Sequence, residues 1–173
     1  MLKGRRIKTR KGNFTRPLLS RIRKSLFDVI GERIRGSKFL DLYAGSGAVG
    51  IEALSRGAKE VIFVEKDNSA LRILKENITL CGLFSLSRVY EKDVLKFLPV
   101  LLREEKFDFI FVAPPYYKGM QNQTLDILEE EKIEGATVIV QHSPKEKINF
   151  NRRNMSLVKQ KKYGDTILTF LEV

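Results

Sequence analysis

The sequence contains little of what disulfide-bonded, metal-binding or membrane proteins need. Cys81 is the only cysteine and His142 the only histidine. A lone cysteine excludes an internal disulfide, and without a second histidine or cysteine we expect no metal site and interpret His142 as structural. No stretch approaches the roughly 18 apolar residues that cross a bilayer. Residues 1–8 are basic with no apolar core behind them, so they do not form a secretory signal. We therefore expect a cytoplasmic protein with no membrane span.

The length and composition predict one globular unit. The chain has 173 residues, of which 43% are hydrophobic and 31% charged. This is enough for one well-buried core and too short for two ordinary domains with a linker. We expect a single domain over residues 1–173, and a monomer, because nothing in the sequence demands a partner chain.

The positive charge is concentrated at the two ends of the chain. Residues 1–24 carry ten Lys and Arg and no acid, residues 25–144 carry fifteen against eighteen, and residues 145–173 carry seven against three. Two basic termini around a nearly neutral middle predict one phosphate-binding face if the fold brings them together. The alternative is a solubilising tail. We favour a nucleic-acid partner, with residues 1–24 as a basic arm and helix start.

Hydrophobic periodicity predicts alternating strands and helices. After a short strand or arm at residues 3–10 and a helix at 18–30, we expect strands at 38–43, 60–65, 88–91, 107–112 and 136–141. Helices are expected between them at 47–56, 68–80, 94–103 and 122–131. Segments 157–163 and 166–173 flank Gly164-Asp165, which is a two-residue hairpin signal. The pattern predicts an α/β fold with a parallel sheet and a C-terminal antiparallel hairpin.

A glycine-rich turn follows the first core strand. Gly45, Gly47 and Gly50 match G-x-G-x-x-G between a strand and a helix, the context in which this motif binds nucleoside cofactors. Glu65 ends the next strand, where a carboxylate accepts both ribose hydroxyls. These features suit a dinucleotide dehydrogenase equally well.

Two carboxylates favour a cofactor without phosphate. Asp41 lies four residues before Gly45 and suits a ligand that carries an ammonium group. S-adenosylmethionine carries one and has no phosphate. Asp93 follows the third core strand and is placed to accept from an adenine amino group, although it also suits a helix cap.

The reacting end is predicted at Ala113-Pro114-Pro115-Tyr116, directly after the apolar run 107–112. An aromatic amine is a poor nucleophile, so its methylation needs acceptors for the N–H groups and a stacked wall that holds the base. Two prolines fix the backbone and its carbonyls, and Tyr116 is able to stack on a base. The alternative is a Pro-Pro strand terminator with a packed tyrosine.

Several segments together resemble one family. They are Thr15-Arg16-Pro17 followed by Arg21–Phe27, then Leu40–Gly57, Phe107–Tyr116 and Lys162–Thr166. They resemble the RsmD-type guanine-N2 methyltransferases of small-subunit (16S) ribosomal RNA. The resemblance implies a seven-stranded, Rossmann-like class I methyltransferase fold, S-adenosylmethionine as donor, and a guanine in the RNA of an assembling subunit as acceptor. It implies RNA contacts by Arg16, Arg21, Arg23 and Lys24. With the motifs, it implies cofactor binding by Asp41, Tyr43, Gly45, Ser46, Gly47, Glu65 and Asp93.

One residue departs from the family pattern, which has Asp before Pro-Pro-Tyr where this chain has Ala113. Three interpretations remain: an active variant that uses the Pro114 carbonyl and water, a weakened homologue that still binds RNA, or an introduced substitution. We hypothesise that Ala113→Asp raises turnover. Amino methylation of adenine or cytosine in DNA, a non-catalytic RNA-binding factor and, more distantly, a dehydrogenase are the competing functions.

Overall fold

A computed structural model of the protein describes residues 7–8 and 16–173. In the first helix, the side chains are described from Leu19 onward. Its α-helices are α1 (Arg16–Ile30), α2 (Ala48–Ser55), α3 (Asn68–Cys81), α4 (Val94–Glu104) and α5 (Met120–Glu130). Its strands are β1 (Lys38–Leu42), β2 (Glu60–Glu65), β3 (Ser87–Glu91), β4 (Phe109–Val112), β5 (Thr137–His142), β6 (Ser156–Tyr163) and β7 (Thr166–Glu172). Two short 3₁₀ helices, Gly31–Ile34 and Phe84–Leu86, were not predicted from the sequence.

All seven strands form one sheet in the order β3-β2-β1-β4-β5-β7-β6. The first five are parallel, whereas β7 pairs antiparallel with both β5 and β6. The residues of β2 and β4 form runs of mostly buried apolar side chains. Runs of this kind are typical of a parallel sheet covered on both faces. The predicted fold class, with its terminal hairpin, is confirmed.

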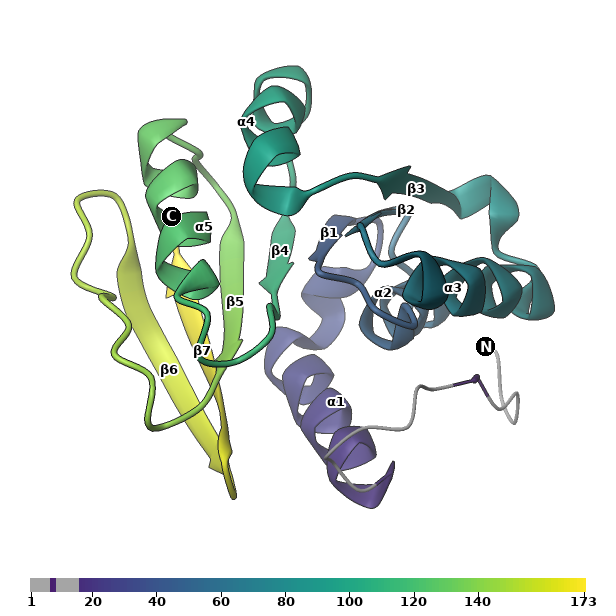
Figure 1. Ribbon diagram of the computed structural model, residues 1–173, viewed down its shortest axis with the longest axis horizontal. Coiled ribbons are helices and arrows are strands. Elements are labelled where there is room, and N and C mark those ends of the chain that lie inside the picture. The colour runs from purple at the N-terminus through teal and green to yellow at the C-terminus, as the bar shows by residue number, and fades with distance from the viewer. Residues whose placement is uncertain (1–6, 9–15) are drawn as a thin grey trace.

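Helices cover both faces of the sheet (Figure 1). On one face α1, α2 and α3 bury a core that includes Phe27, Phe39 and Phe63. On the other face α4 and α5 pack against a second core that includes Leu98 and Leu125. Because helices cover both faces, a ligand can approach the sheet at the amino ends or the carboxyl ends of its strands. We call these the two edges of the sheet.

Local signals explain where the elements begin and end. The Asp67 side chain caps α3 by accepting a hydrogen bond from the backbone N–H of Ala70 at 2.9 Å. Gly82 ends the same helix in the left-handed region, as the sequence predicted. The strand predicted at residues 3–10 falls mostly outside the described residues, and Ile7 and Lys8 are not part of a strand.

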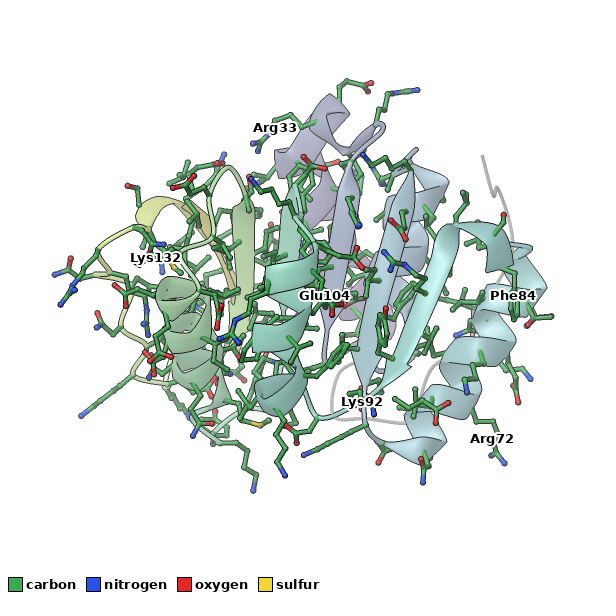
Figure 2. All side chains as sticks on the ribbon, turned by 90° about the horizontal axis from the view of Figure 1, so that it is seen from above. Arg33, Arg72, Phe84, Lys92, Glu104 and Lys132 are labelled. Carbon is green, nitrogen blue, oxygen red and sulfur yellow. The ribbon has the colours of Figure 1, made fainter. Side chains whose placement is uncertain are left out.

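The two edges of the sheet differ in character. Arg33 and Lys92 lie at opposite edges (Figure 2). Arg33 lies at the edge formed by the amino ends of the strands. At this edge Glu105 forms ion pairs with both Lys38 and Arg88. Lys92 follows the carboxyl end of β3 and lines a large cavity, which makes that edge the candidate site.

Candidate active site

The cavity lies where the order of the strands reverses. The chain proceeds from β1 to β2 and β3 on one side, and then returns to place β4 against the other side of β1. Leu42 at the end of β1 is in register with Val112 at the end of β4. In open α/β sheets this reversal opens a crevice beyond the carboxyl ends of the strands, which is the usual ligand site.

The cavity has a volume of about 930 Å³, which is within the usual range for small-molecule sites. Its walls combine the two motifs singled out in the sequence. The lining residues are Tyr43, Gly45, Glu65, Lys66, Asp67, Lys92, Asp93, Val94, Ala113, Pro114, Pro115, Tyr116, Tyr117, Lys118, Met120 and Gln141. The glycine turn and the Pro-Pro-Tyr segment therefore border the same cavity.

The three glycines of the turn do different things. Gly45 lies on the cavity at φ 57°, and a Cβ there would meet nothing within 4 Å. A Cβ on Gly50 would lie 2.3 Å from the Phe63 ring, and one on Gly47 would lie 2.2 Å from Leu74. Gly45 thus leaves room for a ligand, whereas Gly47 and Gly50 allow α2 and the turn to pack against the core. Neither Gly47 nor Ser46 lines the cavity.

Asp41 lies beneath the cavity rather than on its wall. Its side chain is buried, and its Oδ2 accepts a hydrogen bond from the backbone N–H of Gly50 at 2.9 Å. Burial, with a smaller contribution from the negative charge of Glu65, raises the pKa of Asp41 to about 8. In this position Asp41 holds the glycine turn, and the structure does not place it against a ligand's ammonium group.

Glu65 and Asp93 present carboxylates to the cavity from the ends of β2 and the loop after β3. Glu65 Oε2 accepts from the N–H of Gly45 at 2.9 Å. Asp93 caps α4 through the N–H of Leu95 at 3.1 Å and pairs with Lys66 Nζ at 2.8 Å. The hydrogen bond from Lys66 is the main cause of the lowered pKa of Asp93. The structure shows Asp93 as a helix cap, and its role toward an adenine amino group stays a prediction.

Two tyrosine hydroxyls at the cavity are held by threonines. Tyr43 Oη is 2.8 Å from Thr124 Oγ1, and Tyr116 Oη is 2.9 Å from Thr166 Oγ1. Burial raises the pKa of both phenols, to about 12 for Tyr43. Both hydroxyls stay neutral at physiological pH, and Tyr116 is fixed as part of the wall.

A loop contact that the sequence did not reveal fixes the Pro-Pro-Tyr segment. The Glu146 carboxylate accepts hydrogen bonds from the backbone N–H groups of Tyr117 at 2.6 Å and Ser143 at 2.8 Å. Tyr117 Oη is also 2.9 Å from Ser143 Oγ. Glu146 lies 29 residues beyond Tyr117 in a segment with no recognisable motif, so no local pattern signalled this role.

The described part of the first helix meets the C-terminal hairpin, and both elements carry basic side chains. The basic segment at residues 1–15 falls almost wholly outside the described residues. Arg21 and Lys24 are exposed on α1, and Lys159 is exposed on β6, with Lys161 two residues further along. We call these four residues the basic surface. Ser25 on α1 contacts the Tyr163 hydroxyl at the tip of the hairpin, which lies next to α1 in Figure 1.

The pKa of Asp28 gives a second sign that α1 and β6 are close. It is lowered first by a hydrogen bond from Lys24 and, at longer range, by the charges of Arg56 and Lys161. Of the other RNA-binding candidates, Arg23 is half-buried with its Nε 3.8 Å from Glu52. The side chain of Arg16 lies outside the described residues.

The described part of the chain offers neither a metal-binding cluster nor a membrane-spanning helix. Residues 7–8 and 16–173 contain no group of three or more histidine, cysteine or acidic side chains arranged to hold a metal ion. No helix within these residues is both long enough and apolar enough to cross a membrane.

Relatives agree with the motifs. YlbH of Bacillus subtilis (strain 168) is 33% identical over 95% of this chain and 91% of its own length. The protein named ribosomal RNA small subunit methyltransferase D of Haemophilus influenzae is 32% identical over 94% of this chain and 85% of its own.

Among solved structures, a hypothetical protein of Thermus thermophilus has a TM-score of 0.80 and 35% identity, with 99% of this chain and 95% of that chain covered. The yhhF protein of Escherichia coli has a TM-score of 0.83 and 27% identity, with 97% of this chain and 91% of that chain covered. The resemblance found in the sequence is confirmed. A family model matches residues 1–172, and the chain belongs to that family, described as conserved hypothetical protein 95.

Proposed function

We propose that this protein transfers a methyl group from S-adenosylmethionine to the exocyclic N2 of a guanine in small-subunit ribosomal RNA. The observation that carries the proposal is the cavity shared by the glycine turn and the Pro-Pro-Tyr segment. Relatives that match most of the chain support rRNA methylation through their names. The choice of guanine N2 rests on the family resemblance alone.

The cavity suits the proposed donor. Gly45 leaves open space at the turn, and Glu65 offers carboxylate oxygens where a ribose would need acceptors. Asp93 lines the same wall and offers a further acceptor, for an adenine amino group. When bound, S-adenosylmethionine supplies a methyl group to the amine nitrogen; the S–C electron pair returns to sulfur and one amine proton passes to water.

The residues of the chain contribute position. Tyr116, tethered to Thr166, offers a ring on which a base stacks, worth about 1–3 kcal/mol per base. Pro114 and Pro115 hold the backbone beside it, and Glu146 fixes the following loop. Holding two reactants in line accounts for much of the barrier lowering available to such a reaction.

The basic surface supports a nucleic-acid acceptor. Two of its four residues, Lys159 and Lys161, lie on the hairpin whose Thr166 contacts Tyr116. Such a surface attracts phosphates without reading sequence. We extend the proposal to an assembling subunit as substrate, a monomeric enzyme and a cytoplasmic reaction.

A non-catalytic RNA-binding role is the second candidate, and Ala113 favours it because a methyl group cannot accept a hydrogen bond from an amine. The test is methyl transfer from labelled S-adenosylmethionine to three substrates from a strain that lacks the gene: bare 16S RNA, partly assembled small subunits and genomic DNA. We expect label at a guanine N2 in the RNA or the particles. Donor binding without transfer to any substrate would establish the second candidate, and transfer to DNA alone would refute the RNA proposal.

A further inference from the structure

Gln141 lies beside Ala113 on the wall of the cavity. Val112 on β4 and Val140 on β5 are in parallel register, so Ala113 and Gln141 are the next residues of two neighbouring strands. Side chains alternate between the faces of a strand, and neighbouring strands are about 4.8 Å apart. Ala113 and Gln141 therefore project side by side at the carboxyl end of the sheet.

The Gln141 amide is held by its nitrogen end. Nε2 donates a hydrogen bond to Tyr116 Oη at 3.3 Å, and that hydroxyl is 2.9 Å from Thr166 Oγ1. No N–H or O–H of residues 7–8 and 19–173 donates to Gln141 Oε1. An amide oxygen has two lone pairs, so this end of the side chain is available to a ligand in the cavity.

The proposed reaction needs an acceptor at this point. The target amine must be turned so that its lone pair faces the donor, which requires a hydrogen-bond acceptor for its N–H. The side chain of Ala113 has no polar atom, and Pro114 and Pro115 offer only backbone carbonyls. Gln141 brings the polar side chain that position 113 lacks, on the same wall and already tied to the stacking tyrosine.

We propose that Gln141 Oε1 accepts a hydrogen bond from the exocyclic amine of the target base and so fills the role left open by Ala113. This inference rests on the proposed function. Because an amide takes up no proton at neutral pH, the proton released from the amine passes to water in the open cavity. Gln141 orients the amine without supplying the negative charge that a carboxylate would add.

A structural role for Gln141 would have a different signature. If its amide served only to steady Tyr116, a new acceptor at position 113 would not repair its loss. If Gln141 and an acceptor at position 113 serve the same N–H, each matters most when the other is absent. The two substitutions then fail to combine independently, which a double-mutant cycle measures.

The experiment compares the parent with Gln141→Leu, Ala113→Asp and the double variant in methyl transfer to the RNA substrate, under both steady-state and single-turnover conditions. We expect Gln141→Leu to lower kcat by roughly 10²-fold, the typical loss for one such polar group. The KM for RNA and the calorimetric affinity for S-adenosylhomocysteine should change little. Ala113→Asp should raise the rate far more in the Gln141→Leu background than in the parent.

Gln160→Leu is the matched control, because Gln160 also donates its Nε2 to a hydroxyl, that of Thr169 at 2.9 Å, but lies outside the cavity. It should leave kcat unchanged. Equal gains from Ala113→Asp in both backgrounds, or full activity in Gln141→Leu, would overturn the assignment while leaving the proposed function intact. A parent protein that transfers no methyl group to any substrate would overturn both.

Discussion

Glu65 Oε2 accepts a hydrogen bond from the backbone N–H of Gly45 at 2.9 Å, which joins the end of β2 to the glycine turn. Its other oxygen accepts from the N–H groups of Lys66 and Asp67, both at 2.8 Å. The carboxylate is thus fixed at the cavity wall before any ligand enters. Such preorganisation reduces the entropy lost on binding.

Glu65→Gln should weaken the binding of S-adenosylhomocysteine by about 10- to 100-fold, because a hydrogen bond to a charged acceptor contributes roughly 1.5–3 kcal/mol. Isothermal titration calorimetry measures the change. Glu91→Gln is the matched control: Glu91 is in register with Glu65 on β3 but does not line the cavity. Equal affinity in parent and Glu65→Gln would remove Glu65 from the cofactor site.

Asp41 makes stability depend on pH. Burial raises its pKa from 3.8 to about 8, so between these values the folded state holds a proton that the unfolded state has lost. The stabilisation from this proton is complete below the unfolded pKa and is lost as pH rises through the folded value. Asp41→Asn keeps an oxygen for the N–H of Gly50 and removes the titration.

Thermal unfolding of parent and Asp41→Asn at several pH values between about 4 and 9 checks this. The melting temperature of the parent should fall relative to that of the variant as the pH rises from the unfolded pKa of 3.8 to the folded value of about 8. Asp28→Asn provides a contrast, because the pKa of Asp28 is lowered in the fold, mainly by its hydrogen bond with Lys24. Parallel curves for the parent and Asp41→Asn would contradict the raised pKa.

Gly50 fits the core only without a side chain. A Cβ there would lie 2.3 and 2.8 Å from two atoms of the Phe63 ring and 2.8 Å from Val61. Overpacking of this kind costs typically about 1–3 kcal/mol. Gly50→Ala should therefore lower the free energy of unfolding by about 1–3 kcal/mol. Urea denaturation measures this change as a lower midpoint.

Ala53→Gly on the same helix separates this clash from a change in helix propensity. It replaces a buried alanine of α2 by glycine and is expected to cost about 1 kcal/mol. Propensity alone predicts that Gly50→Ala stabilises α2 and Ala53→Gly destabilises it. A Gly50→Ala protein as stable as the parent would show that the core accommodates the methyl group.

The sequence predicted elements and motifs well where the signal was local. Strand and helix periodicity, the glycine turn and the Pro-Pro-Tyr corner all appear within a few residues of their own positions. It did not reveal which glycine lines the cavity, because that depends on Phe63 and Leu74 packing from other elements. Gln141 was missed for a related reason: its meaning comes from its neighbour Ala113, which lies far earlier in the chain on the adjacent strand.

The basic surface provides a prediction about RNA. Lys159 and Lys161 lie on β6, and no described carboxylate forms an ion pair with either. A lysine that contacts a phosphate releases a counterion, so its removal weakens binding in a salt-dependent way. The variant with both lysines changed to glutamine should bind RNA more weakly, whatever the RNA sequence. The slope of log affinity against log salt concentration should become shallower by about 1 for each lysine removed.

Lys106→Gln is the matched control for this measurement. Lys106 is exposed, as Lys159 is, but it precedes β4, at the opposite edge of the sheet from the cavity. It should leave both affinity and slope unchanged. The lysines of β6 are expected to contact phosphates and not the target amine. The kcat at saturating RNA should therefore be unchanged in the variant that lacks both lysines. An unchanged salt slope would show that RNA approaches the cavity over a different face, and the hairpin would then serve only to hold Tyr116 through Thr166.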